Sequence, residues 1–354
     1  MDNTSNFAFL VHPPEIKDVA KKFSVARFIP SFLLRKIIRF LPPLFGAPIT
    51  GFKLPDGRQI EGAVIICPLT AQQLVDNPEL GKKKVLQSVR FAEKLGYKYI
   101  GLGAFTSIVT DGGEYLLDKV SINITTGNAY AAALAIENLI KISAKVGISL
   151  EESTLAVVGA AGSVGSACSK ILAKKVKKII LLDKRADELK EIAGQVRNIN
   201  PNTEAEPYLP EPLKADAVIT VTSSAEGIIK PRNLYPGTVV IDCAQPHNVA
   251  AEVVYNRQDI LVVHSGIAYL EGIKIHMDVG IGAQEIYACL GEALIMVWRN
   301  WKGPYSIGKV KPEHVTDILD IAPQIGLTVA GFRNQAGKIT EGDFERIKKV
   351  RTKI

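Results

Sequence analysis

The sequence has few cysteines, and none of them is arranged as metal or redox sites usually require. Four are present among 354 residues, and they lie far apart: Cys67, Cys168, Cys243 and Cys289. None belongs to a C-x-x-C pair or lies in a cluster with histidine, so neither a zinc site nor a disulfide framework is predicted. The corresponding expectation for the compartment is a reducing one, the cytoplasm.

No export signal is expected from the first residues, and long uninterrupted hydrophobic runs are missing. The first residues, M-D-N-T-S-N, are acidic and polar, whereas a signal peptide starts basic and continues apolar. The longest apolar segment, Phe28–Ile49, is interrupted by three basic residues and four prolines. It therefore cannot span a bilayer as one helix.

The overall composition is that of a globular protein with an excess of basic residues. Hydrophobic residues make up 47% of the chain and charged residues 22%, and the length exceeds one core of about 150 residues, so two or three domains are expected. The formal net charge of +7 favours acidic partners such as phosphates, nucleic acid, an anionic membrane or an acidic protein. Nucleic acid is disfavoured, because no binding motif or aromatic-interleaved basic pattern is found.

Apolar periodicity divides the chain into three parts. Residues 1–127 alternate short apolar runs, such as F-A-F-L-V (7–11), with helical patterns such as 82–95, and predict an α/β substrate domain. Residues 128–270 predict a Rossmann-type domain with strands at 154–159, 178–183, 217–222, 238–243 and 260–264. Residues 271–354 predict a helical segment that packs on the N-terminal domain. The expected fold class is α/β, with a central doubly wound parallel sheet.

Three glycines mark the start of the predicted Rossmann domain. Gly159, Gly162 and Gly165 follow a strand and open a helix in V-V-G-A-A-G-S-V-G-S-A. Glycine allows a tight turn and a close approach of the backbone to a pyrophosphate, and the helix N-terminus favours its negative charge. The turn, with Ser163 and Val164, therefore predicts a dinucleotide site.

Three residues after the second Rossmann strand bear on which dinucleotide binds. Asp183 is expected to accept hydrogen bonds from both ribose hydroxyls and to repel a 2′-phosphate, which favours NADH. Lys184 and Arg185 follow at once and offer positive charge to that phosphate, which favours NADPH. The predicted cofactor is therefore NADPH or NADH, with the preference open.

Four stretches of the sequence resemble the cyanobacterial long-chain acyl-(acyl-carrier-protein) reductases, within a wider group often labelled predicted amino acid dehydrogenases. They are G-L-G-A-F-T-S-I-V (101–109), T-T-G-N-A-Y-A-A (125–132), the glycine turn (157–167) and Y-A-C-L-G-E-A-L (287–294). The resemblance implies NAD(P)H-dependent reduction of a fatty acyl thioester, from acyl carrier protein or acyl-CoA, to a fatty aldehyde. It also implies a cysteine that carries the acyl group, and its A-C-x-x-E-A pattern places this nucleophile on Cys289.

From the residues alone, Cys289 is a core cysteine of an apolar helix expected to begin near Gly282. In that helix Cys289 lies about two turns from the N-terminus, with Glu285 and Glu292 on its face. Their carboxylates oppose formation of a thiolate. Cys243, at the end of a predicted strand, is the rival nucleophile.

Other polar residues are candidates for contacts with the substrate or its oxyanion, and each has a structural alternative. His12 follows the first strand and either donates a hydrogen bond near the thioester or is a satisfied structural histidine. Thr126 and Asn128 begin a long alanine-rich helix and either offer donors to an oxyanion or cap a turn between domains. Ser265, with His264, ends the last Rossmann strand and lies beside the nicotinamide or in ordinary packing.

The end of the fourth Rossmann strand carries a further polar group. Thr222, Ser223 and Ser224 lie at the sheet edge where such folds place the nicotinamide half of the cofactor. A plain helix cap is the alternative interpretation of these three residues.

The segment F-I-P-S-F-L-L-R-K-I-I-R-F-L-P-P-L-F (28–45) predicts a short basic amphipathic helix between prolines. Four roles are open for such a helix. It can rest on a membrane, receive an acyl chain, dock an acidic carrier protein, or simply cover its own domain. Peripheral membrane contact through residues 28–46 therefore stays open for a protein expected in the cytoplasm.

Two other functions also stay open. One is an amino-acid or shikimate-type dehydrogenase, which transfers hydride directly without a covalent intermediate. The other is a non-catalytic nucleotide sensor or partner-binding protein that keeps the same fold.

Overall fold

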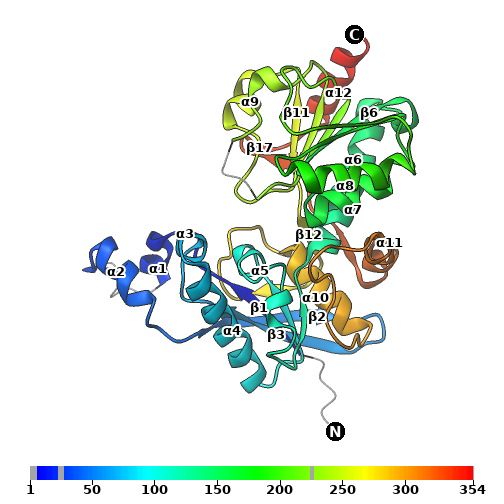
Figure 1. Ribbon diagram of the computed structural model, residues 1–354. Helices are drawn as coiled ribbons and strands as arrows, with labels where there is room; N and C mark the ends of the chain where they lie inside the picture. Colours follow the sequence, from blue (N-terminus) through cyan, green and yellow to red (C-terminus); the bar gives the residue numbers. More distant parts are fainter. Residues whose placement is uncertain (1–5, 23–27, 224–226, 354) are drawn as a thin grey trace. The chain divides into compact units, whose positions relative to one another are not determined.

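The computed structural model describes residues 6–22, 28–223 and 227–353, and the chain divides into two compact units (Figure 1). The first unit contains Met1–Gly127, Leu270–Gly308 and Ile321–Leu327. The second contains Asn128–Tyr269, Lys309–Asp320 and Thr328–Ile354. Residues 271–354, expected as one helical segment, are thus shared between the units and carry short strands as well as helices.

The first unit is built on a mixed six-stranded sheet of order β13-β2-β3-β1-β4-β5. The parallel strands are β1 (Phe7–Val11), β3 (Gln59–Ile66), β4 (Tyr99–Leu102) and β5 (Asn123–Thr125). β2 (Leu44–Lys53) runs antiparallel to β3, and β13 (Lys274–Ile275) runs antiparallel to β2. The carboxyl ends of β1, β4 and β5 consequently meet at one edge of the sheet.

Alternation along β4 separates the two faces of this sheet. Ile100 and Leu102 belong to a core that also contains Val89 of α4 (Pro78–Lys94). Gly101 lies on the opposite face, where α10 (Ala288–Trp298) packs on β1, β4 and β5. A helix on each face buries both sides of the parallel strands.

Several shorter elements complete the first unit. The predicted helix between prolines is confirmed as α2, but it ends at Ile38 and β2 starts at Leu44, because Pro42 and Pro43 interrupt the helical pattern. The remaining elements are α1 (Ile16–Lys22), α2 (Ser31–Ile38), α3 (Ala71–Asp76), α5 (Phe105–Ile108), β14 (Glu285–Tyr287) and the 3₁₀ turns Glu114–Leu116 and Ala322–Ile325.

The second unit holds six parallel strands in the order β11-β10-β9-β6-β7-β8. They are β6 (Thr154–Val158), β7 (Lys178–Leu182), β8 (Thr203–Glu206), β9 (Ala217–Thr220), β10 (Val239–Asp242) and β11 (Leu261–His264). This is the Rossmann-type order, with the first strand in the middle, so the predicted α/β fold class is confirmed. The apolar pattern misses β8, because the sequence T-E-A-E is polar and lies at the sheet edge.

The helices of the second unit connect these strands. α6 begins at Asn128, one of the two residues expected at the start of this helix, and Thr125 belongs to β5. The helices are α6 (Asn128–Val146), α7 (Ser163–Leu172), α8 (Ala186–Arg197), α9 (Ala251–Asn256), α11 (Pro312–Ile321) and α12 (Glu341–Arg351). The second unit also contains two 3₁₀ turns (Leu150–Glu152, Pro231–Asn233) and the hairpin strands β16 (Arg333–Asn334) and β17 (Gly337–Lys338). Two short strands, β12 (Ile267–Leu270) and β15 (Leu327–Val329), each contain a point at which the chain passes from one unit to the other.

Candidate active site

Cys289 is the second residue of α10, and the structure corrects the predicted position of this helix. The helix begins at Ala288, not near Gly282, because residues 285–287 form β14. Cys289 therefore lies in the first helical turn, where the backbone N–H groups favour a negative charge. Glu285 lies outside the helix, and its carboxylate accepts a hydrogen bond from the N–H of Gly282 at 2.8 Å. The expectation that it shares a helical face with Cys289 is wrong.

Two glycines make room for the start of α10. A Cβ on Gly127 would lie 2.2 Å from the Cα of Cys289, and a Cβ on Gly101 would lie 2.5 Å from the carbonyl oxygen of Cys289. Gly127 also has a φ of +77°, a left-handed conformation that strains other residues. The glycines of G-L-G-A-F and T-T-G-N thus let β4 and the end of β5 contact the backbone of Cys289.

Burial and the nearby backbone act on the pKa of the Cys289 thiol in opposite directions. Burial raises the pKa of the thiol to about 12, although backbone hydrogen bonds from Leu290, Cys289 itself and Ala104 oppose the rise. Ala104 has a φ of +48°, an uncommon conformation for a residue with a side chain. Backbone N–H groups in this position can stabilise a negative charge that develops beside the sulfur.

Glu292, three residues after Cys289, is fully buried. Its carboxylate accepts hydrogen bonds from the hydroxyls of Thr125 and Ser306. Burial is the main reason for the raised pKa of Cys289, and the negative charge of Glu292 adds a smaller contribution in the same direction. The hydroxyl of Thr126, a predicted oxyanion contact, donates to the carbonyl oxygen of Ser306 at 2.6 Å, so it belongs to the same network. Sequence reasoning misses Ser306, because it lies in a loop without a recognisable motif.

His12 lies at the end of β1, beside the turn that carries Ala104. Its Nε2 accepts a hydrogen bond from the N–H of Phe105 at 3.4 Å, and its Nδ1 lies 3.1 Å from the carbonyl oxygen of Pro13. Burial lowers the pKa of His12, against the opposing effect of the Pro13 hydrogen bond. A neutral imidazole with its proton on Nδ1 satisfies both contacts, so His12 supports the turn before α5.

The second unit contains the predicted dinucleotide site, between β6 and α7. Gly159 has a φ of +89°, and a Cβ on Gly165 would lie 2.1 Å from the carbonyl oxygen of Gly159. α7 starts directly after Gly162, whose position lacks a side-chain cap among the described residues. The Oγ of Ser163 accepts from the N–H of Val310 at 3.0 Å. A tight glycine turn at an uncapped helix start fits a pyrophosphate.

Asp183 and Arg185 form one polar group at the end of β7. The carboxylate of Asp183 accepts from Nε and Nη2 of Arg185, both at 3.0 Å, and from the N–H of Ala161 at 3.1 Å. Burial alone would raise the pKa of Asp183, but these hydrogen bonds bring it below its ordinary value. The carboxylate expected to accept from ribose hydroxyls therefore holds Arg185 in place.

The guanidinium of Arg185 borders the glycine turn. Its Nη2 lies 3.7 Å from the position that a Cβ on Gly162 would take, and its side chain is 44% exposed. Nη1 of Arg185 also pairs with Glu188 at 2.8 Å. Lys184 is exposed beside it.

Thr222 borders the turn from β9. A Cβ on Gly159 would lie 3.0 Å from the Cγ2 of Thr222. The N–H and hydroxyl of Thr222 donate to the Oδ1 of Asn248 at 3.0 and 2.9 Å. Sequence reasoning misses Asn248, a buried residue in a loop. Ser223 is exposed, and Ser224 lies outside the described residues.

Ser265 and the rival nucleophile Cys243 lie near each other at the carboxyl ends of β10 and β11. The Oγ of Ser265 accepts from the Nδ2 of Asn138 at 2.8 Å, which ties it to α6. Burial raises the pKa of Cys243 well above its ordinary value, with the charge of Cys168 adding to the rise and a hydrogen bond with Ser265 opposing it. These contacts are typical of a packed core.

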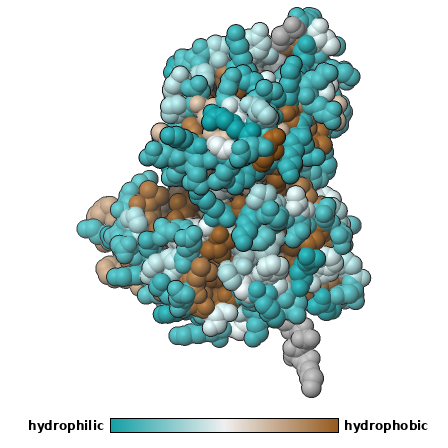
Figure 2. Space-filling view, turned by 45° about the vertical axis from the view of Figure 1, so that its right-hand side comes forward, coloured by the Kyte–Doolittle hydropathy of each residue, from teal (hydrophilic) through white to brown (hydrophobic). Residues whose placement is uncertain are grey.

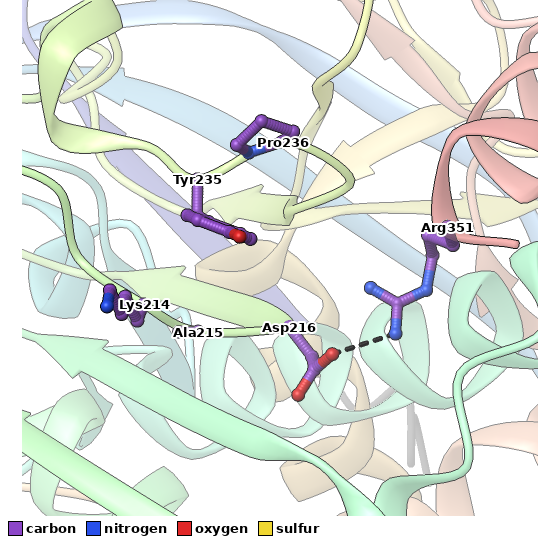
Figure 3. Close-up of a pocket in the computed structure, with 6 residues that line it drawn as sticks. All are labelled: Lys214, Ala215, Asp216, Tyr235, Pro236 and Arg351. Atoms are coloured by element: carbon purple, nitrogen blue, oxygen red, sulfur yellow. Dashed lines mark hydrogen bonds and ion pairs between the residues drawn. The ribbon is translucent and has the colours of Figure 1, made fainter. Parts of the chain in front are cut away.

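A hollow of about 390 Å³ opens elsewhere in the second unit, at the amino ends of β9 and β10 (Figure 3). Arg351 of α12 reaches Asp216 at 2.8 Å across it, and Tyr235 lines it. The glycine turn follows the carboxyl end of β6, at the opposite edge of this parallel sheet. The hollow therefore contains none of the predicted site residues, and its ion pair joins α12 to the sheet.

Comparison with known proteins agrees with the Rossmann-type fold of the second unit. Residues 141–263 match the Shikimate / quinate 5-dehydrogenase family, a range that contains the glycine turn and the parallel strands of the second unit up to Val263.

Three similar proteins extend this comparison. A long-chain acyl-[acyl-carrier-protein] reductase of Synechococcus elongatus is 27% identical over 279 residues, 73% of this chain and 77% of the relative. An aminotransferase, PigE, of a Serratia species is 27% identical over 284 residues, 77% of this chain, which spans only 33% of that relative. A glutamyl-tRNA reductase of Cyanophora paradoxa is 27% identical over 210 residues, 54% of this chain and 47% of the relative. The two reductases and the Shikimate / quinate 5-dehydrogenase match support an oxidoreductase of a broad dehydrogenase and reductase family, with NADPH or NADH as its cofactor. The aminotransferase match does not bear on this.

Proposed function

We propose that this chain reduces a fatty acyl thioester to a fatty aldehyde with NADPH or NADH, and that Cys289 carries the acyl group between the two steps. The similar protein named a long-chain acyl-[acyl-carrier-protein] reductase supports this substrate class. The observation that carries the proposal is the contact of Gly101 and Gly127 with the backbone of Cys289. These contacts set the first turn of α10, with the Cys289 thiol, directly against the ends of β4 and β5.

In the first step, the sulfur of Cys289 attacks the carbonyl carbon of the thioester. A new C–S bond forms to Cys289, the C–S bond to the donor breaks, and the departing thiolate takes up the proton lost by the Cys289 thiol. Because the pKa of Cys289 is raised to about 12, attack and proton loss are coupled at neutral pH. The N–H groups of Ala104 and Leu290 stabilise the charge that develops on the carbonyl oxygen.

In the second step, the acyl group is reduced and released from Cys289. When bound, the reduced nicotinamide supplies the hydride. The glycine turn and the start of α7 hold the pyrophosphate, while Thr222 and Arg185 border the turn on either side. Cys289 returns to a thiol by taking up one proton, so the balance is thioester, NAD(P)H and a proton giving aldehyde, thiol and NAD(P)⁺.

The proposal is tested by incubating the chain with a long-chain acyl-CoA or acyl carrier protein thioester and NADPH or NADH, and by measuring aldehyde. We expect aldehyde from the wild type, several orders of magnitude less from Cys289→Ser, and a much smaller change in Cys243→Ser. Serine keeps the shape of the side chain but is a poor nucleophile. Cofactor binding without turnover of thioesters, hydroxy acids or amino acids would favour a sensor instead.

A dehydrogenase with direct hydride transfer is the second candidate. The match of residues 141–263 to the Shikimate / quinate 5-dehydrogenase family favours it. This function needs no nucleophile, so Cys289→Ser would keep its activity toward a hydroxy or amino acid substrate.

A further inference from the structure

The positive charge of the chain is concentrated in one stretch of the first unit. Residues 19–55 contain seven Lys or Arg and no Asp or Glu, and the whole chain has a formal net charge of +7. The rest of the chain therefore contains equal numbers of basic and acidic residues. This stretch includes α2, whose basic side chains lie within an apolar sequence.

The same stretch exposes large apolar side chains. Phe28, Phe32 and Phe40 are 89%, 68% and 86% exposed, and Leu33 and Ile37 are 42% and 37% exposed. α1 and α2 stand at the edge of the first unit, and hydrophobic side chains gather on that side of it (Figures 1 and 2). Single exposed apolar residues are common, whereas several in one short segment mark a binding surface.

α2 is held on the first unit by packing and by hydrogen bonds. Leu34 and Ile38 are buried in a small cluster with Ile16 of α1. The Nε2 of Gln73 donates to the carbonyl oxygen of Arg35 at 2.8 Å, and the Nζ of Lys84 donates to that of Leu41 at 2.7 Å. The orientation of the helix is thus set by the unit that carries it.

The outward side of α2 has an apolar part and a basic edge. An α-helix turns about 100° per residue, so Phe32 and Lys36 face most nearly away from the buried Leu34, at about 160° from it. Leu33 and Ile37 lie on one side of this pair, and Arg35 and Arg39, one turn apart, lie on the other. We call the exposed apolar and basic residues of this stretch the α2 surface: Phe28, Phe32, Leu33, Arg35, Lys36, Ile37, Arg39 and Phe40.

The basic residues of the α2 surface are available to a partner. Arg35, Lys36 and Arg39 are exposed, and none of them forms a salt bridge with another described residue. No acidic side chain of the same stretch competes for them. Their positive charge is therefore open to a partner that also contacts the exposed apolar side chains.

We propose that the α2 surface docks this chain on an anionic lipid bilayer, with its phenylalanines at the boundary between head groups and acyl chains and its basic side chains at the lipid phosphates. A bilayer interface supplies an apolar layer and anionic groups side by side, which matches the surface in both respects. An acidic protein would match the cations, but an acidic surface would not bury Phe28, Phe32 and Phe40 in an apolar layer. The proposal stands independently of the thioester reaction.

The contact is peripheral. α2 has eight residues, far fewer than the roughly 20 that cross a bilayer. Among residues 6–22, 28–223 and 227–353, no helix combines the length and apolar character needed to cross a membrane.

Flotation of the full chain with lipid vesicles tests the charge requirement. We expect binding to vesicles of phosphatidylcholine mixed with phosphatidylglycerol, weak binding to phosphatidylcholine alone, and a decrease as salt is raised. Each basic residue at such a surface is worth about fivefold in affinity, so a triple variant Arg35→Glu, Lys36→Glu and Arg39→Glu should bind at least about 100-fold more weakly. The matched control reverses three exposed lysines of the second unit, Lys174→Glu, Lys175→Glu and Lys177→Glu, with the same change in net charge and a much smaller expected effect.

Substitution of the phenylalanines tests the apolar contact. Phe32→Ser and Phe40→Ser should each weaken vesicle binding, whereas Tyr208→Ser, at a position 65% exposed elsewhere, should not. The fluorescence of Phe32→Trp should be quenched further by brominated lipid than that of the wild type. A wild type that floats with neither vesicle, or variants that bind like the wild type, would overturn the proposal. It would also be overturned if Phe32→Ser dissociated a dimer of a chain that does not bind vesicles, since the surface would then join two copies.

Discussion

The close approach of Gly127 to Cys289 predicts a large loss of stability in Gly127→Ala. The added methyl carbon would lie 2.2 Å from the Cα, 2.5 Å from the Cβ and 2.6 Å from the backbone nitrogen of Cys289, so the start of α10 would have to move. Overpacking of this kind costs about 1–3 kcal/mol. The left-handed φ adds about 1–2 kcal/mol for a residue with a side chain. We therefore expect the free energy of unfolding of the first unit to fall by about 2–5 kcal/mol.

The matched control for this variant is Gly96→Ala. Gly96 also lies in the first unit and has a φ of +88°, but no atom lies within 4 Å of the position of its added Cβ. Gly96→Ala therefore carries the cost of a left-handed φ, as Gly127→Ala does, but not the cost of overpacking. Urea unfolding followed by tryptophan fluorescence is the assay, because the two tryptophans of the chain, Trp298 and Trp301, both lie in the first unit. If Gly127→Ala is no less stable than Gly96→Ala, the glycine is not needed to accommodate Cys289.

Three further predictions concern the two sites. Gly162→Val should weaken NAD(P)H binding at least about tenfold. Its φ of −71° suits any residue, but the added Cβ would lie 3.2 Å from the carbonyl oxygen of Gly159, so circular dichroism should first establish that the variant is folded. An unchanged Kd in a folded variant would remove the pyrophosphate from this turn. Arg185→Ala should weaken NADPH binding more than NADH binding in a titration, with Lys190→Ala, at an exposed position of α8, as the control. Equal losses would place Arg185 away from the 2′-phosphate. The rate of alkylation of Cys289, followed by peptide mass spectrometry, should rise about tenfold per pH unit from about pH 7 to about pH 10. The reason is that a pKa of about 12 leaves the thiol mostly protonated over that range. A rate that levels off near pH 9 would contradict the raised pKa.

The second unit is the part of the fold that the sequence predicts best, because its signals are local. β6, the glycine turn, α7 and β7 follow one another within about 30 residues, and each has its own pattern. The start of α10 has no such signal. Residues 285–287 continue the apolar pattern of the helix, but they form β14 because the chain pairs there with a distant segment, as in the hydrogen bond from the N–H of Leu270 to the carbonyl oxygen of Gln284 at 2.9 Å.

The partners of the site residues are harder to predict than the residues themselves. The position of Asp183 at the end of a strand follows from the sequence, but its engagement by Arg185 and Ala161 depends on how the glycine turn folds back on β7. The motif G-L-G-A-F is visible in the sequence as part of the family resemblance. The contact of its Gly101 with Cys289 joins residues nearly 190 positions apart and becomes apparent only in three dimensions.

The central claim is that Cys289 accepts an acyl group, and intact mass spectrometry tests it most directly. The chain is incubated with a long-chain acyl-CoA or acyl carrier protein thioester in the absence of cofactor, so that the acyl group stays on the protein. We predict an adduct of one acyl group on the wild type and on Cys243→Ser, and none on Cys289→Ser. An adduct on Cys289→Ser equal to that on the wild type would contradict the claim and move the nucleophile to another residue, with Cys243 the first to test.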